Sequence, residues 1–113
     1  MQHELFFQNP IFRKGLNVSV RNGEKWMNAN IGDELLIKET DKDQTIAYGT
    51  LVGKALLPAN LIPKSLLKHE HDPSCRNLAG LLSEMHRVYS DFQENNLVTV
   101  LFINLKIAPT ADG

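Results

Sequence analysis

The sequence lacks the features that mark several large classes of protein. It contains a single cysteine, Cys75, so no disulfide can form within the chain. No apolar run reaches the roughly 18 residues that a membrane-spanning helix needs. The first residues also lack the basic region and long apolar stretch of a secretory signal. Together these absences predict a cytoplasmic protein with no membrane partner.

Neither sign of charge is in marked excess. Lysine and arginine number 12, aspartate and glutamate number 13, and the formal net charge is −1. This balance argues against a protein whose whole surface grips duplex DNA. The charges are unevenly spread, because Arg13, Lys14, Arg21 and Lys25 come close together and acidic residues follow over 33–43. A local basic patch is therefore compatible with the composition.

The residues that are present predict one small globular domain. Of the 113 residues, 42% are hydrophobic and 22% are charged, which are ordinary values for such a domain. Apolar alternation and turn residues predict strands over 4–8, 16–21, 33–39, 44–57 and 97–107, with a short helix near 61–67 and a longer one over 78–89.

The last strand is dense in apolar residues, which favours a central place in the sheet. A central last strand returns the chain to its first strands, so the order of elements predicts an α+β fold. We expect a small, mostly antiparallel β-barrel with covering helices over residues 1–108. Residues 109–113 are expected to form a flexible tail. Gly49 and Gly53 predict bulges in the long strand.

The most informative segment is the strand around residues 14–21. Alternation puts Leu16, Val18 and Val20 on one face. The other face then carries Asn17, Ser19 and Arg21. A row of amide, hydroxyl and guanidinium groups beside a polar loop is a candidate ligand site.

Each of these polar residues has two interpretations. Arg21 can bind a phosphate or stack on a base, because its planar donors suit both; alternatively it pairs with Asp33 or Glu34. Ser19 and Asn17 can donate to a nucleoside or polarise a carbonyl; alternatively they face solvent.

Residues elsewhere add further candidates. Lys25 and Trp26 form a cation–aromatic pair in an Asn- and Gly-rich loop, which suits single-stranded nucleic acid; alternatively Trp26 closes the end of the core. A zinc site can be considered from four residues: His69, His71, Cys75 and His86. Their spacing matches no recognised zinc pattern and supplies only one thiolate, so we expect neither a metal nor a cofactor. His69 is expected to border the cleft.

Several short motifs together resemble the ASCH family, within the PUA-like superfold. The motifs are Phe6–Gln8, Val18–Arg21, Ile31–Leu35, Leu66–His69, Leu78–Tyr89 and Val98–Leu105. The pattern is most similar to the small bacterial branch that includes N(4)-acetylcytidine amidohydrolases. The resemblance implies a PUA-like barrel that binds RNA or a modified nucleoside.

The resemblance also implies residues for catalysis, if the chain is an enzyme. The amidohydrolase branch is implied to use a lysine, a threonine and a glutamate. Ser19 stands at the hydroxyl position, and Glu70 or Asp72 can supply the carboxylate. Leu16 occupies the lysine position of the family, so Lys14 would have to reach the pocket from a shifted position. The alternative for Lys14 is an exposed surface residue.

Three functional hypotheses follow. The first is an RNA- or nucleoside-binding domain whose cleft lies beside Arg21 and is lined by Asn17, Ser19, Lys25, Trp26, His69 and Asp72. The second is an amidohydrolase that deacylates N(4)-acetylcytidine through Lys14, Ser19 and Glu70. The third is a non-enzymatic interaction module without a ligand site, in which Leu16 and Trp26 would fill the cleft.

Overall fold

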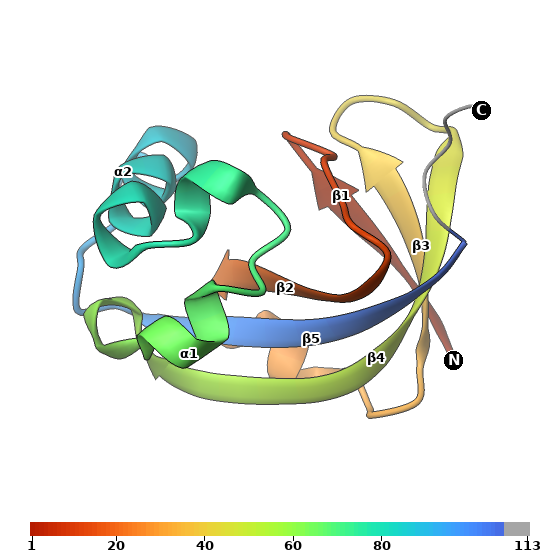
Figure 1. Ribbon diagram of the computed structural model, residues 1–113, viewed down its shortest axis with the longest axis horizontal. Helices are drawn as coiled ribbons and strands as arrows, with labels where there is room; N and C mark the ends of the chain where they lie inside the picture. The colour runs from red at the N-terminus through yellow and green to blue at the C-terminus, as the bar shows by residue number, and fades with distance from the viewer. Residues whose placement is uncertain (108–113) are drawn as a thin grey trace.

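The computed structural model describes residues 1–107, so the predicted tail at 109–113 and the domain boundary at 108 lie outside the described residues. The five strands are β1 (Gln2–Phe7), β2 (Gly15–Asn22), β3 (Glu34–Glu39), β4 (Thr45–Pro58) and β5 (Leu97–Ile107). The two α-helices are α1 (Lys64–Leu67) and α2 (Leu78–Val88), and three 3₁₀ helices are η1 (Lys25–Asn28), η2 (Ala59–Leu61) and η3 (Pro73–Cys75). Figure 1 shows β4 and β5 as long curved strands, with α1 and α2 on one side of them.

The strands form one mixed sheet in the order β1-β3-β4-β5-β2. β1 runs parallel to β3, and the other neighbouring pairs are antiparallel. The mostly antiparallel arrangement and the interior place of β5 are therefore as predicted. The prediction of a closed barrel is wrong, because the edge strands β1 and β2 do not pair with each other within residues 1–107. The sheet is open, and few helices pack against it.

Another segment occupies the free edge of β2 and so prevents closure. The backbone N–H of Val18 donates to the carbonyl of His69 at 2.8 Å, and the N–H of His71 donates to the carbonyl of Val18 at 2.9 Å. These bonds satisfy edge groups that a closed barrel would have given to β1. The segment that follows α1 therefore lies between the two edge strands and holds them apart.

β4 bends so that it can pair with both β3 and β5. Its register against β5 shifts between Tyr48 and Gly49 and again between Leu51 and Gly53, which confirms the predicted irregularities. A Cβ atom at Gly53 would lie 2.9 Å from the ring of Phe102 on β5. Glycine is therefore needed for the close approach of the strands at this bulge.

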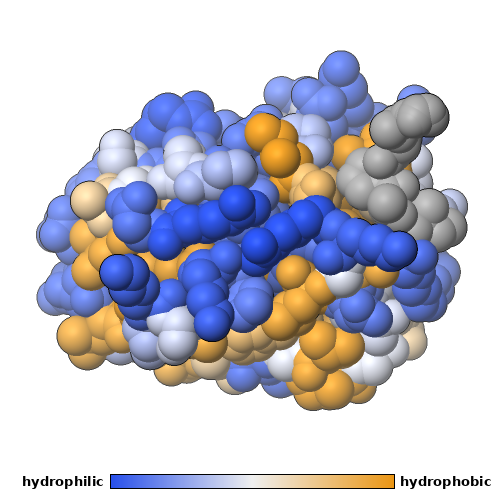
Figure 2. Space-filling model, viewed as in Figure 1, coloured by the Kyte–Doolittle hydropathy of each residue, from blue (hydrophilic) through white to orange (hydrophobic). Residues whose placement is uncertain are grey.

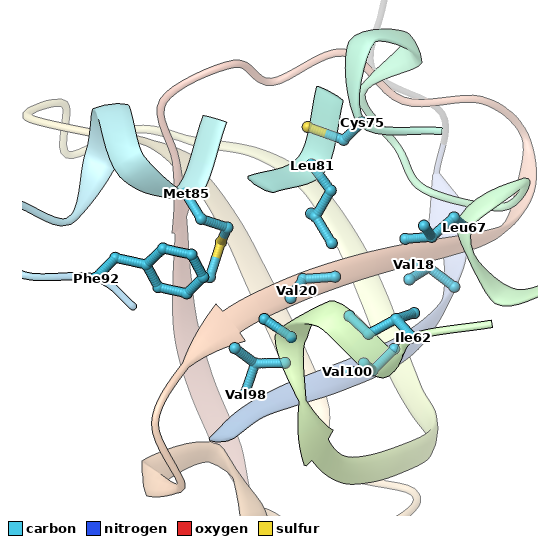
Figure 3. Close-up of a cluster of buried hydrophobic side chains, with 11 residues drawn as sticks. Val18, Val20, Ile62, Leu67, Cys75, Leu81, Met85, Phe92, Val98 and Val100 are labelled. Carbon is cyan, nitrogen blue, oxygen red and sulfur yellow. The ribbon is translucent and has the colours of Figure 1, made fainter. Parts of the chain in front are cut away.

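The curved sheet buries side chains on both of its faces. One core lies between the sheet and the helices, and Figure 3 shows Val18 and Val20 of β2 facing Leu81 and Met85 of α2 within it. The other core lies on the opposite face, around Leu35, Ile37, Leu51 and Leu101. Because both faces are covered, Asn17 and Ser19 on the polar face of β2 are buried, and Arg21 at its end is half-buried.

α2 begins where the sequence predicts. The side chain of Asn77 accepts a hydrogen bond from the N–H of Gly80 at 2.8 Å and so caps the helix. α2 has 11 residues, and no helix within residues 1–107 is long and apolar enough to cross a membrane. The cytoplasmic location stays a prediction.

A candidate ligand pocket at the open edge of the sheet

A pocket of about 260 Å³ lies where the sheet fails to close. Its walls come from the end of β1, the end of β2, residues 70–75 and one side of α2. The polar groups on the lining include Gln8, Asn9, Ser19, Arg21, Thr40, Glu70, His71, Asp72 and Glu84. Apolar and aromatic groups include Phe6, Phe7, Leu81, Met85, Val88 and Tyr89. The pocket thus combines a polar part with an apolar helical wall.

Arg21 connects the two edge strands, β1 and β2, across this opening. Its Nε donates to Ser19 Oγ at 3.0 Å, and its Nη1 donates to the carbonyl of Phe6 on β1 at 2.7 Å. The guanidinium carbon also lies 4.5 Å from the centroid of the Phe7 ring. Burial lowers the pKa of Arg21 to about 10, and this value leaves the guanidinium charged at neutral pH. Arg21 pairs with neither acidic residue that the sequence offered as a partner.

Glu70 is the most unusual group in the pocket, because it is a carboxyl group with only 2% of its surface exposed. One oxygen accepts a hydrogen bond from the N–H of Asp72 at 3.0 Å. Burial raises the pKa of Glu70 to about 8, with a smaller rise from the carboxylate of Asp72. These effects outweigh the lowering by the backbone N–H of Asp72, by Arg21 and by the backbone of Val20. Glu70 is therefore mostly a neutral carboxylic acid at pH 7.

His71 stands beside Glu70 and is also neutral. Its Nδ1 lies 3.0 Å from the carbonyl of Ile11, which places the ring proton on Nδ1. Its Nε2 is then free to accept and lies 3.4 Å from Oε1 of Glu70. Burial lowers the pKa of His71 to about 4. A neutral carboxylic acid thus faces a neutral imidazole, and the proton that the pair can release near neutral pH is the one on Glu70.

Two neighbouring groups have more ordinary roles. Asp72 accepts hydrogen bonds from the N–H and the Oγ of Ser74, each at 2.9 Å, and so caps η3. Burial acts to raise the pKa of Asp72, but hydrogen bonds from Asn9 and Ser74 outweigh it and the pKa is lowered. Burial raises the pKa of the Cys75 thiol to about 12, so this thiol is a poor nucleophile.

Four of the residues predicted for the site come together in the pocket. They are Ser19, Arg21, Glu70 and Asp72, which come from β2 and from the segment before η3. Asn17 is different, because its side chain is 1% exposed and ties down the loop before β2. Its Nδ2 donates to the carbonyl of Arg13 at 2.8 Å, and its Oδ1 accepts from the N–H of Arg13 at 3.2 Å.

The remaining predicted residues do not line this pocket. Lys14 is exposed in the loop before β2. Lys25 is exposed on η1. Trp26 packs against the core cluster that includes Leu35, and it makes an edge contact with His3, with ring centroids 5.7 Å apart. His69 contributes its carbonyl to β2 and lies outside the pocket wall. These residues cannot reach a ligand in the pocket from their positions here.

The four residues considered for zinc have different partners. His69 lies 3.5 Å from Arg13, and His86 lies 3.4 Å from Glu94. His71 and Cys75 both border the pocket. Among residues 1–107, no three His, Cys, Asp or Glu side chains converge as metal ligands would.

Sequence reasoning missed several residues of the pocket. Leu81 and Met85 follow the apolar stripe of α2, and they belong to the core as well as to the pocket wall. His71 lies in the loop 69–72 that the sequence predicts at the cleft wall, but by itself it suggested only a metal ligand. The polar pair Gln8-Asn9 directly after an apolar strand was a signal for a site at that strand end. Leu16 is 38% exposed and is not among the residues that line the pocket, so it does not fill it.

Two solved structures resemble this fold. One is a crystal structure of an ASCH domain from Lactobacillus crispatus JV V101, with a TM-score of 0.59, 13% sequence identity, and coverage of 79% of this chain and 63% of that chain. The other is a crystal structure of a DUF984 protein from Enterococcus faecalis V583, with a TM-score of 0.52, 15% identity, and coverage of 82% and 63%. The chain thus spans less than two thirds of either protein. No family model and no curated protein matches the chain. The likeness shows that the chain has the fold of an ASCH domain.

Proposed function

We propose that the pocket beside Arg21 binds the base of a modified nucleoside, either free or within RNA. The observation that carries the proposal is the pairing of a buried polar cluster with an apolar wall in one cavity of about 260 Å³. Ligand pockets commonly have volumes of about 300–1,000 Å³. A cavity slightly below that range suits one small planar ligand.

The chemistry of the lining fits a nucleobase. Leu81, Met85 and Val88 offer an apolar surface for the face of a ring. Glu70 as a neutral acid carries one proton that it can donate to an acceptor on the edge of a base, although its Oε1 already accepts from the N–H of Asp72. The resemblance to the ASCH family supports this choice, because it implies ligands of the RNA or nucleoside class.

The charge of the pocket supports an uncharged ligand group. Asp72 and Glu84 lie on its wall together with Arg21. Two carboxylates oppose a phosphate, and the guanidinium of Arg21 already uses two of its donors within the protein. We therefore expect the base to enter the pocket and any phosphate to lie outside it.

A pocket-filling substitution tests the proposal without removing a polar group. Val88→Trp places a large ring at the pocket wall, whereas Val52→Trp adds the same ring at an exposed position on β4 outside the pocket. Cytidine, N(4)-acetylcytidine and other nucleosides would be screened by thermal shift and then by calorimetry. At least one nucleoside should bind to the wild type and to Val52→Trp, and at least tenfold more weakly to Val88→Trp.

The proposal fails if no nucleoside binds the wild type, or if Val88→Trp binds as well as the control. Arg21→Ala is a second test, because it removes the bridge between β1 and β2. Unchanged nucleoside affinity in that variant would remove Arg21 from the site.

A second candidate function is deacylation of N(4)-acetylcytidine, and the Glu70–His71 pair favours it. Water would attack the acetyl carbon, the bond from that carbon to N4 would break, and acetic acid and cytidine would leave. Glu70 would donate its proton to N4, and the proton from water would return to the carboxylate. Lys14 has no part in this scheme because it does not line the pocket.

The assay is release of cytidine from N(4)-acetylcytidine by wild type and by Glu70→Gln. Turnover in the wild type with a loss of 10²-fold or more in the variant is expected for a general acid. No cytidine with excess wild-type protein rules out this enzyme and leaves the binding proposal standing. Equal turnover in the two proteins would exclude the role of Glu70.

A further inference from the structure

Four exposed cationic side chains gather beside the pocket on a different surface. They are Arg13 and Lys14, in the loop before β2, and Lys64 and Lys68, on and just after α1. None of the four forms an ion pair with an acidic side chain among residues 1–107. We call these four residues the basic surface. Its charges are free to bind an external anion.

Hydrogen bonds bring the two segments of the basic surface together. Nη2 of Arg13 donates to the carbonyl of Lys68 at 2.8 Å, although the two residues are far apart in sequence. Lys68 donates its backbone N–H to the carbonyl of Lys64, which places the two lysines one helical turn apart on the same side. Figure 2 shows a band of strongly hydrophilic side chains across the middle of the face where α1 lies in Figure 1.

One loop connects this surface to the pocket. Asn9 lines the pocket and bonds to Asp72, the carbonyl of Ile11 meets His71, and Arg13 reaches Lys68. The four residue-to-residue steps from Asn9 to Arg13 span at most about 14 Å when extended. Phosphates on one strand of a duplex are about 3.4 Å apart along the axis. A segment of a few nucleotides can therefore contact both places.

We propose that the basic surface binds the phosphates of a single-stranded RNA whose neighbouring base enters the pocket. This inference rests on the proposed function and narrows its ligand to a base within a chain. A single strand is required because a base must leave its stack to enter the pocket. The four cations of the basic surface do not line the pocket, whereas the charged Arg21 inside it already donates to Ser19 and to the carbonyl of Phe6. The basic surface is therefore the better place for the phosphates.

A matched pair of variants tests the basic surface. The test variant replaces Lys14, Lys64 and Lys68 with glutamine. The control replaces Lys42, Arg87 and Lys106, which are also exposed and lie in ion pairs elsewhere. Both variants lose three positive charges. Circular dichroism would check that each is folded.

The probe is a labelled single-stranded RNA of ten nucleotides, with binding followed by fluorescence anisotropy between 50 and 200 mM salt. Each lost phosphate contact should flatten the slope of log affinity against log salt by about 0.7. The slope of the test variant should therefore be shallower than that of the wild type by about 2. Between 50 and 200 mM salt, the RNA affinity of the test variant should then fall by a factor roughly 16 times smaller than that of the wild type. The control should keep the wild-type slope, and a duplex of the same sequence should bind more weakly.

The outcomes separate this inference from the proposed function. Nucleoside binding in the pocket should be the same in the test variant and in the wild type. An unchanged RNA slope in the test variant, or tighter binding of the duplex, would overturn the basic surface while nucleoside binding still stands. If RNA binding depends on the basic surface but no nucleoside binds, the proposal that the pocket binds a base would instead be overturned.

Discussion

Replacing Glu70 with glutamine should remove a fall in stability that the wild type shows above pH 6.5. The pKa of Glu70 rises from its ordinary 4.5 to about 8 on folding, because burial disfavours the charged form. Folding therefore retains a proton that the unfolded chain releases. The resulting contribution to stability is present below pH 4.5 and is lost as the pH rises through 8.

His71 acts in the opposite direction at lower pH. Burial lowers its pKa from 6.5 to about 4, so the unfolded chain holds a proton that the folded chain does not. The stabilising contribution of neutral His71 to the free energy of unfolding is therefore present above pH 6.5 and is lost as the pH falls to 4. Between pH 4.5 and 6.5 the folded chain holds a proton on Glu70 and the unfolded chain holds one on His71, so the two states bind equal numbers of protons. The free energy of unfolding should therefore be nearly flat in that range.

Above pH 6.5 only the Glu70 effect remains. One retained proton changes the free energy of unfolding by about 1.4 kcal/mol per pH unit. The wild type should lose about 2 kcal/mol between pH 6.5 and 8. Glu70→Gln should show almost no change over this range, and it should lose stability between pH 6.5 and 4.5, where the His71 effect is then unopposed.

Urea unfolding at several pH values measures these slopes, and fluorescence of the single tryptophan, Trp26, reports the transition. Glu84→Gln is the matched control, because Glu84 also lines the pocket but bonds to Arg87 at the surface. The control should keep the wild-type fall. The reasoning is refuted if Glu70→Gln loses as much stability between pH 6.5 and 8 as the wild type does, whatever its overall stability.

Three further predictions concern other parts of the chain. Leu16→Lys should change stability by less than about 0.5 kcal/mol and create no acetylcytidine turnover, because residue 16 is exposed and does not line the pocket; a gain in turnover would contradict this placement. Gly80→Ala should destabilise the fold by about 2 kcal/mol or more in urea unfolding, since its Cβ would lie 1.9 Å from the carbonyl oxygen of Ser74; stabilisation, as helix propensity alone predicts, would refute the clash. Asn17→Ala should cost about 1–3 kcal/mol by the same assay, since it leaves the carbonyl and N–H of Arg13 without a partner; a change below 0.5 kcal/mol would exclude the role of this amide.

Much of the local structure could be predicted from the sequence. The bounds of β5, the cap of α2 at Asn77 and the irregular register near Gly49 all follow from neighbouring residues. Ser19 and Arg21 could be assigned to one face of β2 because side chains alternate along a strand. Such patterns depend on contacts within a few residues, which the sequence displays directly.

Only the tertiary structure decided how the pocket is assembled. The segment 69–71 pairs with β2 and keeps the sheet open, and Arg21 then reaches the carbonyl of Phe6 across the gap. The unusual pKa of Glu70 arises because elements distant in sequence exclude water from its carboxyl group. Desolvation depends on all neighbours in space, so no local pattern of residues could reveal it. The sequence by itself thus determined the strands and the polar face of β2, and tertiary packing decided which polar groups share one pocket.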